Sequence, residues 1–296
     1  MKLIRFGGSG EERPGVLMPD GSRVAVSGLV RDYDEDFFAN NGISELDRWL
    51  RSNLSTAPKE DPAARLGPPI CRPSKIVCIG LNFRDHARES KMEIPDEPVI
   101  FLKSTSSLVG PNDDLVIPKN GNKVDWEVEL AVIVGKRASY VDREQALEYV
   151  AGYALHNDYS DRGFQFEHAG QWVKGKSADT FAPLGPFVAT REQLSDISDL
   201  RMWLKVNGVF KQRSSTREMI FDVPSLVSYV TQFMTLLPGD VLSTGTPAGV
   251  GLGRKPPEYL RPGDVVELGI DGVGQSRQSV IAWPSARDSK ECKLAV

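Results

Sequence analysis

The stretch "DWEVEL" at residues 125–130, continued by "AVIVG" at 131–135, places two acids in a run that then becomes apolar. Glu127 and Glu129 are two residues apart, so on a β-strand their side chains share one face, while Val128 points to the other. Neighbouring carboxylates repel each other, and at least one pKa rises unless a cation lies between them. The spacing therefore predicts either a solvated strand face paired with Lys or Arg across the sheet, or a ligand set for Mg²⁺, Mn²⁺ or Ca²⁺.

Around this strand, the sequence indicates a mainly β protein with some helices (α+β) and no regular alternation of strand and helix. The 296 residues include 20 prolines and 27 glycines between short apolar runs, a composition that favours many turns. Asp20-Gly21 and Asn207-Gly208 are expected to form hairpin turns. A helix is expected at 142–150, with Asp142 as its N-cap, and a second helix is expected at 222–236.

A segment rich in Pro, Ala and charged residues, 52–70, separates two parts of the chain. We expect a domain boundary near residue 70, with a small N-terminal α+β domain and linker over residues 1–70. A larger domain is expected over residues 71–296, and it holds every candidate for chemistry.

Composition argues against several classes of protein. The chain is 26% charged with a net charge of −4, so it lacks the basic excess expected of a nucleic-acid-binding protein. It has no run of about 18 apolar residues for a membrane span, and its N-terminus lacks the apolar region of a signal peptide. The three cysteines, Cys71, Cys78 and Cys292, have no metal-site spacing, so we expect reduced thiols in a cytoplasmic protein.

A third acid, Asp158, ends the apolar run "GYALHND" at 152–158. The end of a strand can deliver a metal ligand into a cleft from a rigid scaffold. Arg162 and Gln165 follow it and would share one side of a helical turn. The alternative for Asp158 is a structural role as the N-cap of that turn. His156, in the same run, has no metal-ligand spacing with the other histidines and is interpreted as structural or as support for a site.

A helix is expected in "FRDHARESK" at 83–91, with Asn82 as its N-cap and with His86 and Glu89 three residues apart. A carboxylate that hydrogen-bonds an imidazole fixes its tautomer and raises its basicity, the usual arrangement of a general base. The alternative is a surface helix on which the two side chains meet incidentally.

Two loops complete the set of candidates. Lys174 and Lys176 lie among small residues, where a lysine could bind a substrate carboxylate or oxyanion, or could simply be solvated. The glycine-rich "STGTPAGVGLG" at 243–253 could cradle an anion with its backbone N–H groups and the Thr246 hydroxyl, or could form a tight turn.

Six motifs occur in order along the chain: "GLNFRDHARE", "FLKSTSSLVGP", "VDWEVELAVIVG", "GYALHNDYSDRGFQ", "KGKSADTFAPLGP" and "TGTPAGVGLG". Together, over roughly residues 72–283, they resemble the fumarylacetoacetate hydrolase family. The resemblance implies a mixed β-sandwich roll of the family's C-terminal type, usually a homodimer. The short N-terminal segment also resembles one that many members carry.

The resemblance also implies roles for individual residues. The family's metal ligands, two strand glutamates and an aspartate, fall on Glu127, Glu129 and Asp158. Its pair that activates water falls on His86 and Glu89.

The lysine of the family's active site falls on Lys176, with Lys174 as the alternative. Arg162 and Gln165 match positions that contact the carboxylate and keto oxygens of the substrate. Thr246 matches the loop that closes over the ligand.

The activity implied is that of a divalent-metal-dependent hydrolase. It would cleave a C–C bond in a 2,4-dioxo acid and release pyruvate and a second carboxylic acid, using one Mg²⁺ or Mn²⁺ per subunit as a Lewis acid. The most similar members are ureidoglycolate-lyase-like proteins and hydrolases of 2,4-diketo-3-deoxy sugar acids, which implies sugar acid catabolism; acylpyruvates are the other substrate class.

The alternatives are decarboxylation of oxaloacetate, isomerisation of an unsaturated 2-oxo dioate, and non-catalytic binding of a metal or carboxylate. The presence of both His86 and Glu89 favours hydrolysis or decarboxylation over isomerisation, and it argues against mere binding.

Overall fold

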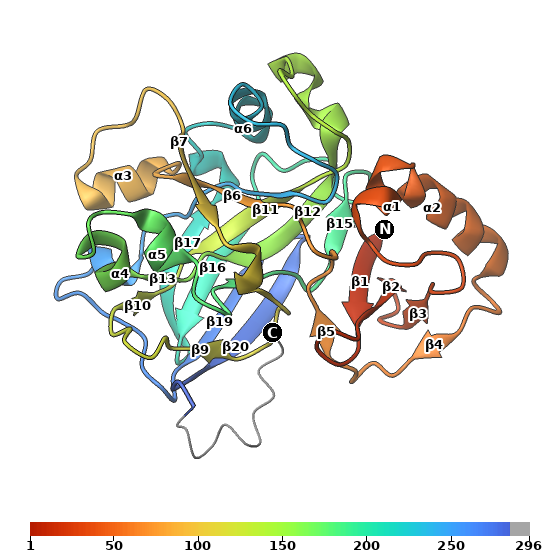
Figure 1. Ribbon diagram of the computed structural model, residues 1–296, viewed down its shortest axis with the longest axis horizontal. Coiled ribbons are helices and arrows are strands. Elements are labelled where there is room, and N and C mark those ends of the chain that lie inside the picture. The colour runs from red at the N-terminus through yellow and green to blue at the C-terminus, as the bar shows by residue number, and fades with distance from the viewer. Residues whose placement is uncertain (285–296) are drawn as a thin grey trace.

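The computed structural model describes residues 1–284 and shows a mainly β chain with some helices (Figure 1). The strands are β1 (Lys2–Phe6), β2 (Arg13–Leu17), β3 (Arg23–Ala25), β4 (Lys59–Glu60), β5 (Leu66–Gly67), β6 (Ile76–Gly80), β7 (Val99–Lys103), β8 (Leu108–Val109), β9 (Leu115–Val116), β10 (Val124–Asp125), β11 (Val128–Val134), β12 (Val150–Asn157), β13 (Ser160–Asp161), β14 (Ala182–Pro183), β15 (Val188–Thr190), β16 (Arg201–Val206), β17 (Val209–Ser215), β18 (Val241–Ser243), β19 (Val265–Ile270) and β20 (Gly274–Ile281). The α-helices are α1 (Glu35–Ala39), α2 (Gly42–Asn53), α3 (Arg84–Ser90), α4 (Arg162–Phe166), α5 (Trp172–Lys176) and α6 (Val223–Val230), and the 3₁₀-helices are η1 (Thr105–Ser107), η2 (Arg143–Tyr149), η3 (Thr216–Glu218) and η4 (Gly251–Gly253).

Two sheets form the framework of the molecule. An eleven-stranded sheet has the order β4-β3-β2-β1-β15-β12-β11-β18-β6-β7, with β5 also paired to β1. A five-stranded sheet has the order β17-β16-β19-β20-β9, and β10-β13 and β14-β8 form two small sheets. Most neighbours are antiparallel, but three pairs are parallel: β18 with β6, β20 with β9, and β14 with β8. This arrangement confirms the predicted mainly β fold with mixed sheets.

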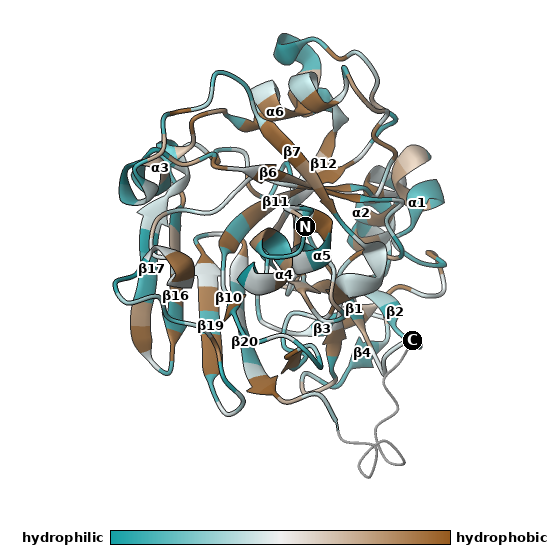
Figure 2. Ribbon diagram, turned by 60° about the vertical axis from the view of Figure 1, so that its left-hand side comes forward, coloured by the Kyte–Doolittle hydropathy of each residue, from teal (hydrophilic) through white to brown (hydrophobic). Residues whose placement is uncertain are grey.

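The main hydrophobic core lies between the two sheets. Leu130 and Val132 of β11 belong to the same buried cluster as Leu204 of β16 and Leu268 of β19. Figure 2 shows hydrophobic residues concentrated on the strands and hydrophilic ones on α3.

Strand β11 is buried on both faces, which explains why its sequence becomes fully apolar. Alternate residues such as Leu130 and Val132 enter the core between the sheets. Ala131 and Ile133 point to the opposite face and join a second core beneath the N-terminal segment. Because side chains alternate, Glu129 lies on the same face as Ala131. The acids therefore stand on the β11 face that continues into the second core.

The N-terminal segment is joined to the rest through the large sheet. Strand β1 pairs with β15, so the sheet runs from the N-terminal strands into the strands that carry the acids (Figure 1). The buried Arg5 guanidinium, whose Nε atom lies 2.6 Å from an oxygen of Asp32, adds an ion pair within this segment. The proposed boundary near residue 70 stays a prediction.

Several local predictions are confirmed and others are wrong. Turns at Asp20-Gly21 and Asn207-Gly208 join antiparallel strands as expected. The helix expected at 142–150 is the 3₁₀-helix η2, because β12 begins at Val150 and leaves only a short segment. The helix expected at 222–236 ends at Val230 in α6, and the chain then turns toward a β-bridge with Ala138.

The described cysteines, Cys71 and Cys78, are free thiols, and Cys292 lies outside the described residues. Within residues 1–284, no helix combines the length and the hydropathy that a membrane crossing needs. The cytoplasmic location stays a prediction.

Replacing Gly152 by alanine should destabilise the sheet that carries the acids. An added Cβ would lie 2.2 Å from the backbone oxygen of Ala189 on β15, too close for any side chain. We expect a loss of about 1–3 kcal/mol in the free energy of unfolding, measured by guanidinium denaturation. Gly28→Ala is the matched control, since its added Cβ meets no atom within 4 Å. Equal stability of both variants would contradict the close approach of β12 and β15.

Candidate active site

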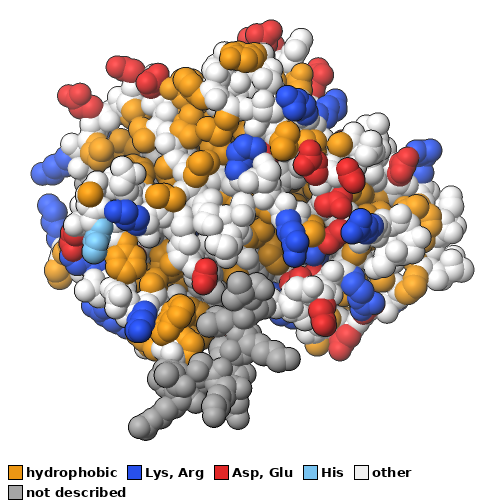
Figure 3. All heavy atoms as spheres, in the orientation of Figure 1, with side chains coloured by type: hydrophobic (Ala, Val, Ile, Leu, Met, Phe, Trp, Pro, Cys, Tyr) orange, Lys and Arg blue, Asp and Glu red, His pale blue; other side chains and the backbone are white. Residues whose placement is uncertain are grey.

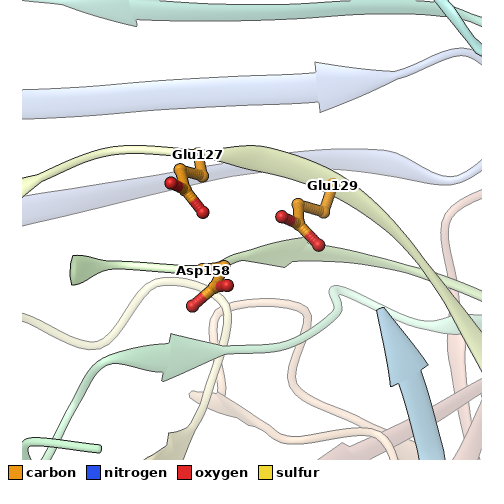
Figure 4. A group of neighbouring side chains, drawn as sticks. All are labelled: Glu127, Glu129 and Asp158. Carbon is orange, nitrogen blue, oxygen red and sulfur yellow. The ribbon is translucent and has the colours of Figure 1, made fainter. Parts of the chain in front are cut away.

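Glu127, Glu129 and Asp158 converge on one small volume inside the protein (Figure 4). One carboxylate oxygen from each lies within 4.8 Å of the others. Their side chains are almost completely enclosed, with exposed fractions of 6%, 1% and 0%. The solvated strand face that the spacing also allowed is therefore wrong.

Main-chain pairing between β11 and β12 brings these acids together. Glu129 is directly opposite His156, and the Asp158 N–H donates to the Glu127 carbonyl at 3.0 Å. The side-chain amide oxygen of Asn157 accepts a hydrogen bond from the Glu127 N–H at 2.9 Å. Asp158 is not a helix cap, because the carboxylate that caps α4 belongs to Asp161.

Two buried lysines neutralise part of the acidic cluster. Lys103 Nζ lies 2.5 Å from one oxygen of Asp158, and Lys176 Nζ lies 2.8 Å from the other. Lys176 also donates to Glu127 at 2.7 Å. Burial alone would raise the pKa of Asp158, but Lys103 and Lys176 outweigh it and hold that pKa well below its usual range. Burial lowers the pKa of Lys176, but Asp158 and Glu127 outweigh it and raise it to about 12.

Helix α5 delivers Lys176 into the cluster. Trp172, one turn earlier, packs edge-on against Phe101 of β7 with ring centroids 5.3 Å apart. The Lys176 ammonium lies 4.8 Å from the centroid of the same Phe101 ring. Lys174 is exposed and donates instead to the His168 carbonyl. The structure therefore brings Lys176, and not Lys174, to the acids.

Glu129 differs from the other two acids because no described cation pairs with it. Its Oε2 atom accepts hydrogen bonds from Ser243 Oγ at 2.6 Å and from the Gly245 N–H at 3.0 Å. Burial, with the charges of Asp158 and Glu127, raises the pKa of Glu129 well above its usual value. Three convergent carboxylates, one of them lacking a counter-charge, fit a divalent cation with oxygen ligands.

Arg162, at the start of α4, ties the acids to the glycine-rich loop. Its guanidinium contacts Glu127, Asp125 (2.9 Å) and Gln165 (2.9 Å), so every branch is used within the protein. The fully buried Asp125 also accepts from the Gly251 N–H at 2.6 Å. The predicted shared side of Arg162 and Gln165 is confirmed by their hydrogen bond.

The glycine-rich loop is held tightly against β11. Thr246 Oγ1 donates to the Val128 carbonyl at 3.0 Å and accepts from Gln212 Nε2 at 2.8 Å. The Thr246 hydroxyl proton is thus committed to the backbone. Any contact with a ligand would use the remaining lone pair of its oxygen.

The His86–Glu89 pair lies on α3, which docks on the same loop. Glu89 accepts from the Gly249 N–H at 2.9 Å, and the His86 Nδ1 atom lies 3.5 Å from Glu89 Oε2. That distance is longer than a hydrogen bond, and His86 Nδ1 has no partner among the described residues. Asn82 does not cap the helix; its amide instead bridges Phe221 and Thr244.

The comparisons with known proteins show the family of this chain. The sequence profile described as "Fumarylacetoacetate (FAA) hydrolase C-terminal" matches residues 75–281. The chain belongs to the fumarylacetoacetate hydrolase family. It is 45% identical, over 96% of its length and 97% of the relative's, to 2,4-didehydro-3-deoxy-L-rhamnonate hydrolase of Sphingomonas sp. (strain SKA58).

Solved structures of the family have the same fold. A fumarylacetoacetate hydrolase from Exiguobacterium antarcticum is 36% identical with a TM-score of 0.83, over 96% of this chain and 100% of that one. A maleylpyruvate hydrolase from Sphingobium sp. SYK-6, solved with manganese(II) and pyruvate, is 29% identical with a TM-score of 0.81 over the same shares. The fold expected from the resemblance is therefore confirmed.

Sequence reasoning missed three residues around the acids and left a fourth without a defined role. Lys103 ends an apolar strand and Asp125 begins the "DWEVEL" stretch, and both are charged residues placed next to buried strands. Ser243, at the end of β18, carries no charge to mark it. His156 was recognised only as a structural or supporting residue. A charge at the end of an apolar run was the usable signal for the first two.

Asp125→Asn should strongly destabilise the protein. Asparagine would leave the buried Arg162 guanidinium with one ionic partner fewer. Its amide NH₂ would also point toward a backbone N–H donor of the loop, where the carboxylate now accepts. We expect a loss of about 3–5 kcal/mol in the free energy of unfolding, measured by chemical denaturation. Asp47→Asn, which breaks the exposed Asp47–Arg51 pair, should cost less than about 0.5 kcal/mol. A similar small loss in both variants would refute the structural role of Asp125.

Proposed function

We propose that this chain is a divalent-metal-dependent hydrolase of 2,4-dioxo acids, acting on an acylpyruvate or a 2,4-diketo-3-deoxy sugar acid. The products would be pyruvate and a second carboxylic acid. The observation that carries the proposal is the enclosed group of Glu127, Glu129 and Asp158, in which Glu129 has no described counter-charge. The rhamnonate hydrolase relative and the maleylpyruvate hydrolase with manganese and pyruvate support this reaction class.

Glu127, Glu129 and Asp158 would hold one Mg²⁺ or Mn²⁺. When bound, the ion supplies Lewis acidity toward the carboxylate and keto oxygens of a 2-oxo acid and toward the enolate that cleavage leaves. Four buried carboxylates face three buried cations here, in a cluster of Asp125, Glu127, Glu129, Asp158, Lys103, Arg162 and Lys176. The cluster thus has one negative charge in excess. A divalent ion would make the net charge of the cluster positive, which favours an anionic substrate.

The remaining residues would act on water and on the developing negative charge. His86 would take a proton from water, with Glu89 orienting its imidazole. The hydroxide would add to the distal ketone, and the Lys176 ammonium would stabilise the oxyanion. Collapse of this adduct would break the C–C bond, release the second acid and leave the enolate of pyruvate, whose carbon would receive the proton held by His86. In this structure Lys176 bonds to two acids, so it is already held at the site.

Substrate contacts by Arg162, Gln165 and Thr246 stay predictions. Each of these side chains already hydrogen-bonds within the protein. A contact with substrate would therefore add to these bonds or exchange one of them. These buried hydrogen bonds suit residues that hold the site in its shape when a ligand binds.

The function is tested by identifying products. The purified chain, stripped with EDTA and reloaded with Mg²⁺ or Mn²⁺, should convert acylpyruvates or 2,4-diketo-3-deoxy sugar acids to equal amounts of pyruvate and a second acid. Activity should vanish with EDTA and return with the ion. Release of CO₂ without a second acid would contradict hydrolysis and indicate decarboxylation. With an unsaturated 2-oxo dioate, a shifted double bond without cleavage would indicate isomerisation, and binding without turnover of any substrate would indicate a non-catalytic protein.

Glu129→Gln should separate metal binding from folding. Glutamine keeps the volume and can accept from Ser243 and Gly245, while it removes a buried charge that no cation balances. The metal-free variant should therefore be at least as stable as the wild type. At 100 times the dissociation constant, Mn²⁺ should stabilise the wild type by about 2.7 kcal/mol and leave the variant unchanged.

The exposed Glu148 provides the control for this experiment. Glu148→Gln makes the same chemical change on the surface and should keep the full Mn²⁺-dependent rise in melting temperature. A Glu129→Gln protein that still melts higher with Mn²⁺ would refute the metal assignment.

The homodimer also stays a prediction. Strand β7 lies at one end of the large sheet, and hydrophobic side chains gather over this part of the face shown in Figure 3. Val99 and Leu102 of this strand are among the exposed ones.

A further inference from the structure

A buried chain of hydrogen bonds stands behind Glu129. Its Oε2 atom accepts from Ser243 Oγ at 2.6 Å, and the same Oγ lies 2.7 Å from His156 Nδ1. All three side chains are enclosed by the protein, with exposed fractions of at most 1%. Nothing in the proposed reaction uses Ser243 or His156.

The donors in this chain follow from counting protons. A metal-bound carboxylate is ionised and only accepts, so Ser243 then donates its single hydroxyl proton to Glu129. Ser243 then has only lone pairs left for the imidazole. His156 must therefore carry its proton on Nδ1 and donate it to Ser243. Its Nε2 atom has no hydrogen-bond partner among the described residues, so Ser243 is the contact that orients the ring.

The three residues stand on three neighbouring strands of the large sheet. Glu129 of β11 is directly opposite His156 of β12. Ser243 of β18, on the other side of β11, is opposite Ala131. Main-chain pairing thus sets the spacing of all three. A side chain on such a framework has little freedom to move. The hydrogen bond that it donates therefore also restricts the orientation of its acceptor.

We propose that Ser243 and His156 are positioning residues that orient the Glu129 carboxylate for metal binding. Oε2 is held by Ser243 and Gly245, whereas Oε1 accepts no hydrogen bond from the described residues and would be the oxygen that binds the metal. Partners behind a metal ligand fix its orientation, and their loss typically weakens metal affinity about 10–100-fold. This inference rests on the proposed metal role of Glu129.

The test measures Mn²⁺ affinity by isothermal titration calorimetry on the full chain without substrate. His156→Leu keeps the bulk but removes the donor, and Ser243→Ala removes the link itself. Both should weaken binding about 10-fold or more. His156→Asn places an amide N–H near the position of Nδ1 and should restore affinity to within about 3-fold of the wild type. His168→Leu, the same change at an exposed histidine, should have no effect.

The double variant His156→Leu/Ser243→Ala gives the decisive comparison. If His156 acts only through Ser243, the double variant should bind Mn²⁺ as weakly as Ser243→Ala alone, and not more weakly. Additive losses of Mn²⁺ affinity would overturn the proposal that His156 acts through Ser243. Unchanged affinity in His156→Leu, with only a lower melting temperature, would show a merely structural role and also overturn it.

Two further controls keep the outcome clear. If His156→Leu fails to fold, His156→Gln replaces it, because that amide extends toward the Nε2 position and leaves Ser243 without its donor. A wild-type chain that binds no Mn²⁺ would overturn the proposed function and this inference together. A wild type that binds Mn²⁺ with a His156→Leu variant that binds equally well would overturn this inference alone.

Discussion

The antiparallel pairing of β11 with β12 is the constraint on which the site depends. It fixes Glu129 opposite His156 and places the Asp158 N–H against the Glu127 carbonyl. Neither strand can slip by one residue, because a slip would turn the valines and leucines of the main core to the opposite face of the sheet and the acids toward the main core. The same register that buries the core therefore assembles the acids.

Burying so many charges is costly unless they are paired, and the pairing here is uneven. Asp158 has two lysines, while Glu127 has Lys176 and Arg162. Among residues 1–284, Glu129 has only neutral donors. This asymmetry is more informative than the charge count, since a purely structural ion cluster has no reason to leave one member unpaired. The unpaired Glu129 therefore supports the proposal that a divalent ion binds at this place.

Periodicity in the sequence was enough to predict the shared face of Glu127 and Glu129, because alternation along a strand is a local property. Local turn signals likewise predicted the hairpin at Asn207-Gly208. The structural details that failed depend on distant contacts: η2 is short because β12 must begin at Val150, and Asn82 bridges distant backbone groups instead of capping α3. Ser243 could not be found from the sequence, since its role depends on strand order alone.

The two halves of the proposed active site are attached in different ways. The acids are fixed by main-chain ladders in a sheet covered on both faces, so their geometry is set before any ligand arrives. The seven-residue helix α3 is held to the glycine-rich loop by side-chain bonds, among them Glu89 with Gly249 and Asp85 with Ala248. His86 Nδ1 lies 3.5 Å from Glu89 and has no hydrogen-bond partner in the described part of the chain, so this contact can shorten without disturbing the sheet. In the proposed reaction, the rigid acidic centre would hold the ion firmly, while the more loosely attached His86 would adapt to the bound substrate.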